Sequence, residues 1–244
     1  MKASPEQQRR LLDVQAIDTR MGRAAHKGRT LPERQQLAAL ADGYAAAREA
    51  LHRTRSVVEL SQAEITRLED DVATVRARAD RDSARLSTST SAKEAVTLES
   101  ELATLMRRAA ELEEVTLVVM ERLEVEDAAF RAAENLYNDL AAQRAELEHK
   151  IAAEMAVIAE QRAAAQVERD EVVRDIDSDL LALYEETRQR YGLGAAMLRN
   201  GVSEGSNMAL TEADLSGIRQ ARPDEILFCK DSGCILVRTD ESGL

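Results

Sequence analysis

Apolar residues recur at alternating steps of three and four along two long stretches of the chain. In the first stretch they are Leu37, Leu40, Tyr44, Ala47, Leu51, Val58, Ile65, Leu68, Val72, Val75, Ala79 and Leu86. In the second they are Leu98, Leu102, Leu105, Ala109, Leu112, Val119, Leu123, Phe130, Ala133, Tyr137, Leu140, Leu147, Ile151 and Ile158. Such a repeat keeps one apolar stripe facing a partner along a supercoiled helix. The pattern therefore predicts two long helices, over residues 33–86 and 91–190.

A run of five hydroxyl residues, Ser87 to Ser91, separates the two stretches. Such a run favours caps and turns, because its hydroxyls compete for backbone hydrogen bonds. Two heptad helices joined by a short turn run antiparallel and bury each other's stripes. We therefore expect a hairpin in which residues 33–86 pair with roughly 92–145, with its tip at 87–91.

A shorter amphipathic helix is expected over residues 4–28. Ser4 and Pro5 suit its N-cap and first helical position, and Pro32 ends it and opens the next helix. This first helix is expected to return along the part of the long helix that the hairpin leaves uncovered, close to residues 146–190. Residues 1–190 would then form one coiled-coil helical hairpin domain.

Three polar residues, Glu126, Arg144 and Glu154, occupy stripe positions of the second long helix. In coiled coils, polar residues at such positions fix the register of the helices or mark places where the stripe meets solvent. We interpret these three residues in that way.

The character of the sequence changes after Tyr191. Glycines return at Gly192 and Gly194, where they mark a helix end, and Thr211 begins a short helix. Residues 226–229 and 234–237 are typical of two strands joined by a turn. We expect residues 191–244 to form a small α+β module. The predicted fold class is mainly α, a long antiparallel coiled-coil hairpin with this module at its C-terminal end.

Composition and charge narrow the picture. The 244 residues are 32% charged and 2% aromatic, and the formal net charge is −12. With so few large rings, the apolar residues are expected along a narrow stripe of an elongated molecule. The acidic balance argues against an indiscriminate nucleic-acid binder, since such binding comes mainly from Lys and Arg that neutralise phosphates.

Two local surpluses of positive charge are candidate binding surfaces. The first lies at the N-terminus and comprises Arg9, Arg10, Arg20, Arg23, Lys27 and Arg29. The second lies around the hairpin tip and comprises Arg76, Arg78, Arg81, Arg85 and Lys93. The alternative interpretation is that both sets are ordinary charged residues on solvated helix faces.

Nothing in the sequence points to catalysis. The three histidines lie far apart, and no phosphate-binding glycine loop is present. No stretch approaches the roughly 20 apolar residues of a membrane span, and the first residues do not resemble a signal peptide. Two cysteines cannot form a disulfide framework. We expect a cytoplasmic protein that is not an enzyme and does not enter a membrane.

Several segments carry a resemblance to a known family. They are Lys93-Glu94-Ala95 and Leu98-Glu99-Ser100-Glu101-Leu102 after the tip, and Ile235-Leu236-Val237-Arg238 in the module. Together with the hairpin pattern, they resemble the bacterial C4-type zinc-ribbon proteins of the coiled-coil hairpin class, especially the actinobacterial members.

The resemblance implies one structural zinc ion held by two Cys-x-x-Cys knuckles. Their four ligand positions correspond here to Ser203, Ser206, Cys229 and Ser232. Three of the four are serine, whose hydroxyl does not ionise near neutral pH as a thiol does on binding metal. We therefore expect a zinc-ribbon-like fold without zinc or another cofactor. Cys234 is expected on the far side of the turn; the alternative is a metal site of Cys229 and Cys234 completed by an outside ligand.

The leading functional hypothesis is a non-enzymatic adaptor or regulator that presents the degenerate zinc-ribbon module to a protein partner. The alternative is RNA or DNA binding by the module and the basic N-terminal helix, which the resemblance also implies. The few aromatic residues weaken this alternative, because they leave few platforms for stacking bases. The chain is expected as a monomeric hairpin or a homodimer whose stripes pair between copies.

Overall fold

The computed structural model describes residues 1–244, and the chain is mainly helical as the sequence predicts. Its contacts divide it into two compact units. The first unit joins residues 1–32 to residues 150–244, and the second comprises residues 33–149. The predicted boundary at 190/191 lies within the first unit, so residues 191–244 share a compact unit with residues 1–32 and 150–190.

The chain has five α-helices, where the sequence predicts four. They are α1 (Pro5–Arg29), α2 (Pro32–Thr88), α3 (Ala92–Val173), α4 (Ser178–Tyr191) and α5 (Glu212–Gln220). Ser4 caps α1 by accepting a hydrogen bond from the Gln7 backbone N–H at 3.3 Å. Pro5 occupies the first turn of α1, where its missing N–H costs nothing. Pro32 begins α2 in the same way. None of these helices is long and apolar enough to cross a membrane.

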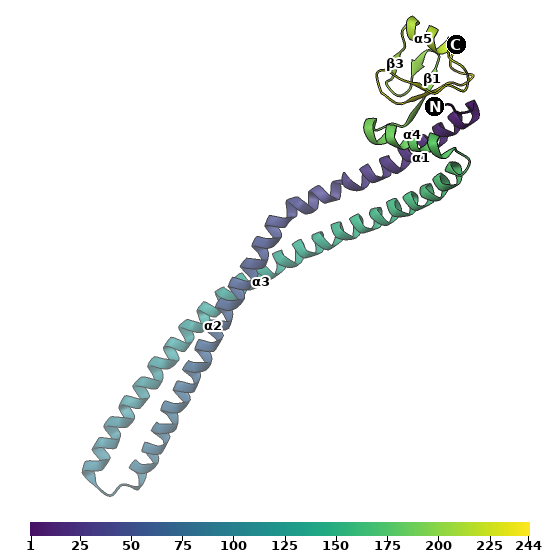
Figure 1. The fold of residues 1–244 in the computed structure, drawn as a ribbon. Coiled ribbons are helices and arrows are strands. Elements are labelled where there is room, and N and C mark those ends of the chain that lie inside the picture. The colour runs from purple at the N-terminus through teal and green to yellow at the C-terminus, as the bar shows by residue number, and fades with distance from the viewer. The chain divides into compact units, whose positions relative to one another are not determined.

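The second unit is the helical hairpin, in which α2 and α3 run antiparallel on either side of the turn at residues 89–91 (Figure 1). Its best-buried apolar cluster contains Ile65, Leu68, Leu112 and Val119, which all belong to the predicted stripes. The hairpin and its seam are therefore confirmed.

A polar layer interrupts this seam next to the apolar cluster. Ser61 is buried and donates a hydrogen bond to Glu126 Oε2 at 2.6 Å. Arg122 reaches the same two residues from α3 and forms an ion pair with Glu64 of α2 at 2.5 Å. A one-turn slip of α2 along α3 would separate Glu126 from Ser61 and Arg122 from Glu64. The layer fits the register role inferred for Glu126.

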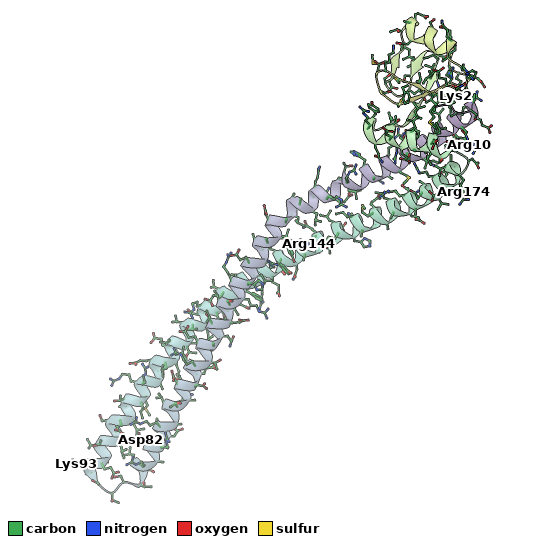
Figure 2. The ribbon with its side chains drawn as sticks, in the orientation of Figure 1. Lys2, Arg10, Asp82, Lys93, Arg144 and Arg174 are labelled. Atoms are coloured by element: carbon green, nitrogen blue, oxygen red, sulfur yellow. The ribbon has the colours of Figure 1, made fainter.

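Asp82 is a second polar residue in the seam, near the tip (Figure 2). Its side chain is 10% exposed, its Oδ2 atom makes no hydrogen bond, and its ion contact with Arg78 is long, at 3.8 Å. Burial of a poorly partnered carboxylate is costly. The Asp82→Leu variant is therefore expected to raise the free energy of unfolding by about 1–2 kcal/mol, measured by urea denaturation followed by circular dichroism.

The matched control for that variant is Asp80→Leu, which makes the same chemical change at an exposed position of the same helix. Its effect is expected to stay within about 0.5 kcal/mol. Equal effects of the two substitutions would show that burial of Asp82 carries no cost.

The single helix predicted over residues 91–190 is wrong in one respect. Helix α3 ends at Val173, and α4 begins at Ser178 with Asp177 as its N-cap. The Asp177 carboxylate accepts hydrogen bonds from the backbone N–H groups of Asp179 and Leu180, at 3.0 and 3.3 Å. The break lets the chain change direction and bury Ile176 in the core of the first unit.

That core joins helices to strands. Leu11 and Val14 of α1 pack with Leu180 and Tyr184 of α4, and with Ala195, Ile235 and Val237 of the sheet. Ala3 adds a backbone hydrogen bond to Asp224, at 2.9 Å. The N-terminal helix therefore packs against the small C-terminal sheet. It supplies much of the apolar surface that a module of about 50 residues lacks on its own.

The sheet has five strands in the order β3-β2-β1-β5-β4. They are β1 (Ala195–Arg199), β2 (Val202–Ser203), β3 (Met208–Ala209), β4 (Leu227–Phe228) and β5 (Ile235–Val237). The predicted antiparallel pair at 226–237 is present as β4 and β5. Strands β1 to β3 are additional, and β1 lies parallel to β5 at the centre of the sheet.

Candidate functional site

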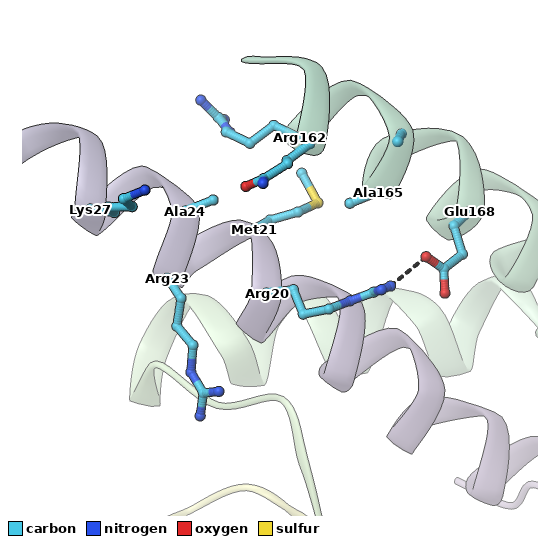
Figure 3. Close-up of a pocket in the computed structure, with 10 residues that line it drawn as sticks. Arg20, Met21, Arg23, Ala24, Lys27, Arg162, Ala165 and Glu168 are labelled. Carbon is cyan, nitrogen blue, oxygen red and sulfur yellow. Dashed lines mark hydrogen bonds and ion pairs between the residues drawn. The ribbon is translucent and has the colours of Figure 1, made fainter. Parts of the chain in front are cut away.

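A groove with a basic lining runs between α1 and α3 in the first unit. Its volume is about 660 Å³, and we call it the basic groove; it is lined by Arg20, Met21, Arg23, Ala24, Lys27, Gln161, Arg162, Ala164, Ala165 and Glu168. Met21 reaches from α1 toward Ala165, which is buried on α3 (Figure 3). Small alanines on both helices leave room above this apolar floor.

Four cations and one carboxylate line the basic groove, although the whole chain carries a net charge of −12. Arg20 forms an ion pair with Glu168 across the groove, as Figure 3 shows. Lys27 pairs with Glu154 at 2.8 Å. Arg23 and Arg162 are exposed and have no acidic partner. Figure 3 also shows that Arg23 extends away from α3, so that it borders the groove without filling it.

A buried ionic network lies beside the basic groove and ties three helices together. Asp18 of α1, whose side chain is 4% exposed, accepts hydrogen bonds from Arg169 Nε and from the Tyr184 hydroxyl, each at 2.8 Å. Arg169 also pairs with Glu185 of α4, and Arg188 contacts both acids. A smaller hollow of about 320 Å³ over this network shares Met21 and Arg162 with the basic groove.

The network changes the protonation behaviour of its members. Burial raises the pKa of Tyr184 strongly, and the hydrogen bond to Asp18 adds to the effect. Burial alone would lower the pKa of Arg169, but its bonds to Asp18 and Glu185 outweigh burial and raise it. Both groups therefore stay protonated throughout the physiological range and hold the helices in place. No member is placed as a proton donor or acceptor for catalysis.

The N-terminal cations predicted as a binding surface do not form one patch. Arg9 pairs with Asp240 at 3.0 Å, and Arg10 pairs with Asp175 at 2.7 Å. Arg20, Arg23 and Lys27 come together on the basic groove. Arg29 is exposed, pairs with no acid and does not line the groove.

The basic residues predicted at the tip are partly neutralised within the hairpin. Arg76 pairs with Glu113 at 2.6 Å, and Arg85 pairs with Glu94 at 3.6 Å. Arg78 makes the long contact with Asp82. Arg81 and Lys93 are exposed without an acidic partner.

The four positions that the resemblance assigns to zinc ligands lie on two turns of the C-terminal module. The Cys229 thiol is 3.8 Å from Ser206 Oγ, and Ser203 and Ser232 contribute to the environment of the same sulfur. Gly205 packs closely over the cluster, because a Cβ atom there would lie 2.7 Å from Cys234 Sγ and 2.9 Å from Ser232 Oγ. We call this group the serine–cysteine cluster, and it comprises Ser203, Ser206, Cys229, Ser232 and Cys234.

Cys234 belongs to this cluster, so the prediction that it lies on the far side of the turn is wrong. Its sulfur is 3.1 Å from Ser232 Oγ. Cys229 and Cys234 face each other across the end of the β4–β5 hairpin, where the Cys229 N–H donates to the Cys234 carbonyl at 2.9 Å. Residues opposite each other in an antiparallel pair share one face of the sheet.

The two thiols differ in protonation. Burial alone would raise the pKa of Cys229, but the Ser203 and Ser232 hydroxyls and the backbone N–H groups of Asp231 and Ser232 lower it to about 7. The Ser203 hydroxyl is fully buried beside this sulfur and makes no hydrogen bond of ordinary geometry. Burial raises the pKa of Cys234. Only one of the two sulfurs therefore has thiolate character near neutral pH.

These donors do not fit the zinc ion that the resemblance implies. Zinc in a structural site is held by four thiolate or imidazole ligands, and the four corresponding positions here offer one thiol and three hydroxyls. No group of three or more His, Cys, Asp or Glu side chains elsewhere in the structure could hold a metal ion.

The arrangement of a long helical hairpin followed by a small strand-containing module is also found in known proteins. Residues 14–192 match the sequence profile of the CT398-like coiled coil hairpin domain. The chain belongs to this family. Its fold resembles the structure of CT398 from Chlamydia trachomatis, with a TM-score of 0.62, 16% identity and coverage of 96% of this chain and 98% of that one. At that identity, the likeness concerns the fold alone.

Mycobacterial members of the CT398-like family are more similar in sequence. The uncharacterized protein Rv2229c of Mycobacterium tuberculosis is 32% identical over 245 residues, which cover 98% of both chains. A solved structure from Mycobacterium smegmatis has 31% identity and a TM-score of 0.81, and the match covers 98% of this chain and 100% of that one. These two matches extend over nearly the whole chain, whereas the family profile covers residues 14–192.

The α3 side of the basic groove was not predicted from the sequence. Arg162, Ala164 and Ala165 lie on α3, about 140 residues from their neighbours on α1, and contact between them depends on how α1 docks. One signal was available, because residues 162–165 read Arg-Ala-Ala-Ala and small side chains allow helices to leave space. The buried acid Asp18 is likewise not distinguished by any sequence pattern.

Proposed function

We propose that this protein is a non-catalytic cytoplasmic adaptor that binds an acidic segment of a protein partner in the basic groove. The observation that supports this most directly is the exposed Arg162 beside an apolar floor, with no acid of its own chain to pair with. A partner carboxylate would gain a charge-assisted hydrogen bond there. The alanines and Met21 would accept apolar side chains of the same segment.

Nucleic-acid binding is supported less well by the same surface. Such binding needs several cations that are free to neutralise phosphates. Of the six N-terminal candidates, Arg9, Arg10, Arg20 and Lys27 already pair with acids of this chain. The remaining two, Arg23 and Arg29, lie on one helix without aromatic platforms nearby.

We also propose that the C-terminal module is a zinc-ribbon-like fold that works without zinc. The supporting observation is that two turns meet as knuckles would, while hydrogen-bonding side chains stand at the ligand positions. The packing of α1 against β1 and β5 gives the module another source of stability. In this proposal, the module closes the first unit and keeps α1, and hence the basic groove, in place.

The proposed function is tested by fluorescence anisotropy with a labelled acidic amphipathic peptide. The Arg23→Glu/Arg162→Glu variant is expected to weaken peptide binding about tenfold or more, because it replaces attraction by repulsion at the groove. The Arg29→Glu variant is the matched control, since it changes a cation of α1 outside the groove and is expected to leave binding unchanged.

A single-stranded RNA of similar net charge serves as the competing ligand in the same assay. Tight RNA binding that falls steeply with salt, together with no peptide binding, would favour nucleic-acid recognition and reject the adaptor proposal. Equal losses from Arg29→Glu and from the groove variant would reject the basic groove as the site.

A further inference from the structure

The helical hairpin has an apolar groove of its own, which lies beside the seam and shares Val72 with it. Its volume is about 600 Å³, and we call it the hairpin groove; it is lined by Glu69, Val72, Ala73, Arg76, Glu113, Thr116, Leu117 and Met120. All of these residues belong to the second unit. Its apolar lining comes from both helices, with Val72 and Ala73 on α2 and Leu117 and Met120 on α3.

The apolar residues of this groove are more exposed than a two-helix hairpin requires. Leu117 is 62% exposed and Met120 is 38% exposed, whereas their neighbour Val119 is 4% exposed in the seam. From Val115 to Met120, every residue except Thr116 is apolar. A helix that is apolar around its circumference is normally covered on more than one side. In the hairpin, only the seam side is covered.

The charges around the hairpin groove suit a second copy of the same chain. Glu69 and Arg76 stand seven residues apart on α2, on either side of Val72 and Ala73. Arg76 pairs with Glu113 of its own chain at 2.6 Å, but its side chain stays 65% exposed and can take a second carboxylate. If two hairpins pack groove to groove about a twofold axis, with their α2 helices antiparallel, Glu69 of each copy meets Arg76 of the other. A twofold interface requires such self-complementarity. An unrelated partner would not require opposite charges at symmetric positions.

We propose that the hairpin groove is a homodimer interface, in which Leu117 and Met120 of each copy fill the groove of the other. This inference goes beyond the adaptor function and does not depend on the basic groove, which lies in the other unit. Dimerisation would present two basic grooves to a partner. A bivalent partner would then bind with an avidity that a single groove lacks.

Sedimentation equilibrium of the full-length chain tests the proposal over about a hundredfold range of concentration. The natural chain is expected to show a monomer–dimer equilibrium. The Leu117→Glu/Met120→Glu variant is expected to weaken association at least tenfold, because it buries charge in the interface. The Val118→Glu variant is the matched control: Val118 is 60% exposed, adjoins Leu117 and does not line the groove. It is expected to dimerise normally.

A charge swap tests the twofold geometry itself. Because Arg76 pairs with Glu113 of its own chain, every Arg76→Glu variant also carries Glu113→Arg, which keeps that pair with reversed signs. Glu69→Arg alone and Arg76→Glu/Glu113→Arg are each expected to weaken the dimer, because each places like charges opposite one another between the copies. The variant that combines all three substitutions is expected to restore the dimer. Circular dichroism confirms that each variant keeps its helices.

Three outcomes would overturn the inference. A natural chain that stays monomeric throughout would exclude a second copy as the occupant of the hairpin groove. If Val118→Glu weakened dimerisation as much as Leu117→Glu/Met120→Glu does, the interface would lie on another face of the hairpin. Failure of the combined charge variant to recover would reject the twofold arrangement.

Discussion

A chain carrying Ser203→Cys, Ser206→Cys and Ser232→Cys is expected to bind one zinc ion tightly, whereas the natural chain is expected to bind none. The reason is geometric, because these positions surround the Cys229 sulfur on two facing turns. Four thiolates around one point form the ligand set that zinc prefers. Titration with Co²⁺ measures the change through the intense absorption of a tetrahedral cobalt–thiolate centre, and zinc then displaces the cobalt.

The control for this experiment is the same triple variant with Cys229→Ser and Cys234→Ser added. It retains the three engineered thiols but lacks both natural thiols of the cluster, so its affinity for the metal is expected to fall by orders of magnitude. A triple variant that binds no metal would show that the two turns are not arranged as knuckles. Stoichiometric binding by the natural chain would reject the proposal of a zinc-free module.

The largest expected loss of stability follows Asp18→Ala. This substitution removes the acid that accepts bonds from Arg169 and Tyr184, and it leaves both donors in a largely dry environment. Removal of one partner from a buried ion pair typically costs 3–5 kcal/mol. Because Arg169 keeps Glu185, we expect a loss of about 3 kcal/mol in the free energy of unfolding, measured by guanidinium denaturation.

Two further variants separate the ionic network from helix effects. Asp13→Ala makes the same change at an exposed position of α1 and is expected to alter stability by less than about 0.5 kcal/mol. Asp18→Asn keeps the oxygen that accepts from Tyr184 and loses the charge, so its effect should fall between the other two. If Asp18→Ala were as mild as Asp13→Ala, the network would contribute nothing to stability.

The hairpin could be predicted from the sequence because each heptad repeat leaves an apolar stripe that the stripe of the other helix can cover. The break at residues 174–177 could not, since it contains neither Pro nor Gly. Its only signal is the cluster of Asp175, Asp177, Ser178 and Asp179, which suits an N-cap as well as a solvated helix face. Tertiary packing decides between the two, because Ile176 enters the core only if the helix ends.

Strands β1 to β3 were missed for a related reason. Ala-Ala-Met-Leu-Arg has weak strand propensity, because Ala is depleted in strands. The Asn200-Gly201 pair was an available hairpin signal. In the structure, both residues have positive φ, 46° and 75°, as the turn between β1 and β2 requires.

The candidate sites differ in how much of each was visible in the sequence. The resemblance located the four serine and cysteine positions. The place of Cys234 within the serine–cysteine cluster depends on its pairing with Cys229 across the β4–β5 hairpin. The basic groove joins residues that are distant in sequence, so its outline depends on the register of α1 against α3. No local pattern encodes that register.

The order in which the ribosome makes the chain bears on how the two units form. The first unit combines residues 1–32 with residues 150–244, while the second lies entirely between them. During translation, the hairpin can therefore zip up through local contacts while the growing chain is still being extended. Leu11 and Val14 must wait for Ile235 and Val237, which are made long after them. A nascent chain thus exposes the apolar face of its first helix until the strands of the sheet have emerged, the period in which chaperones would be needed most.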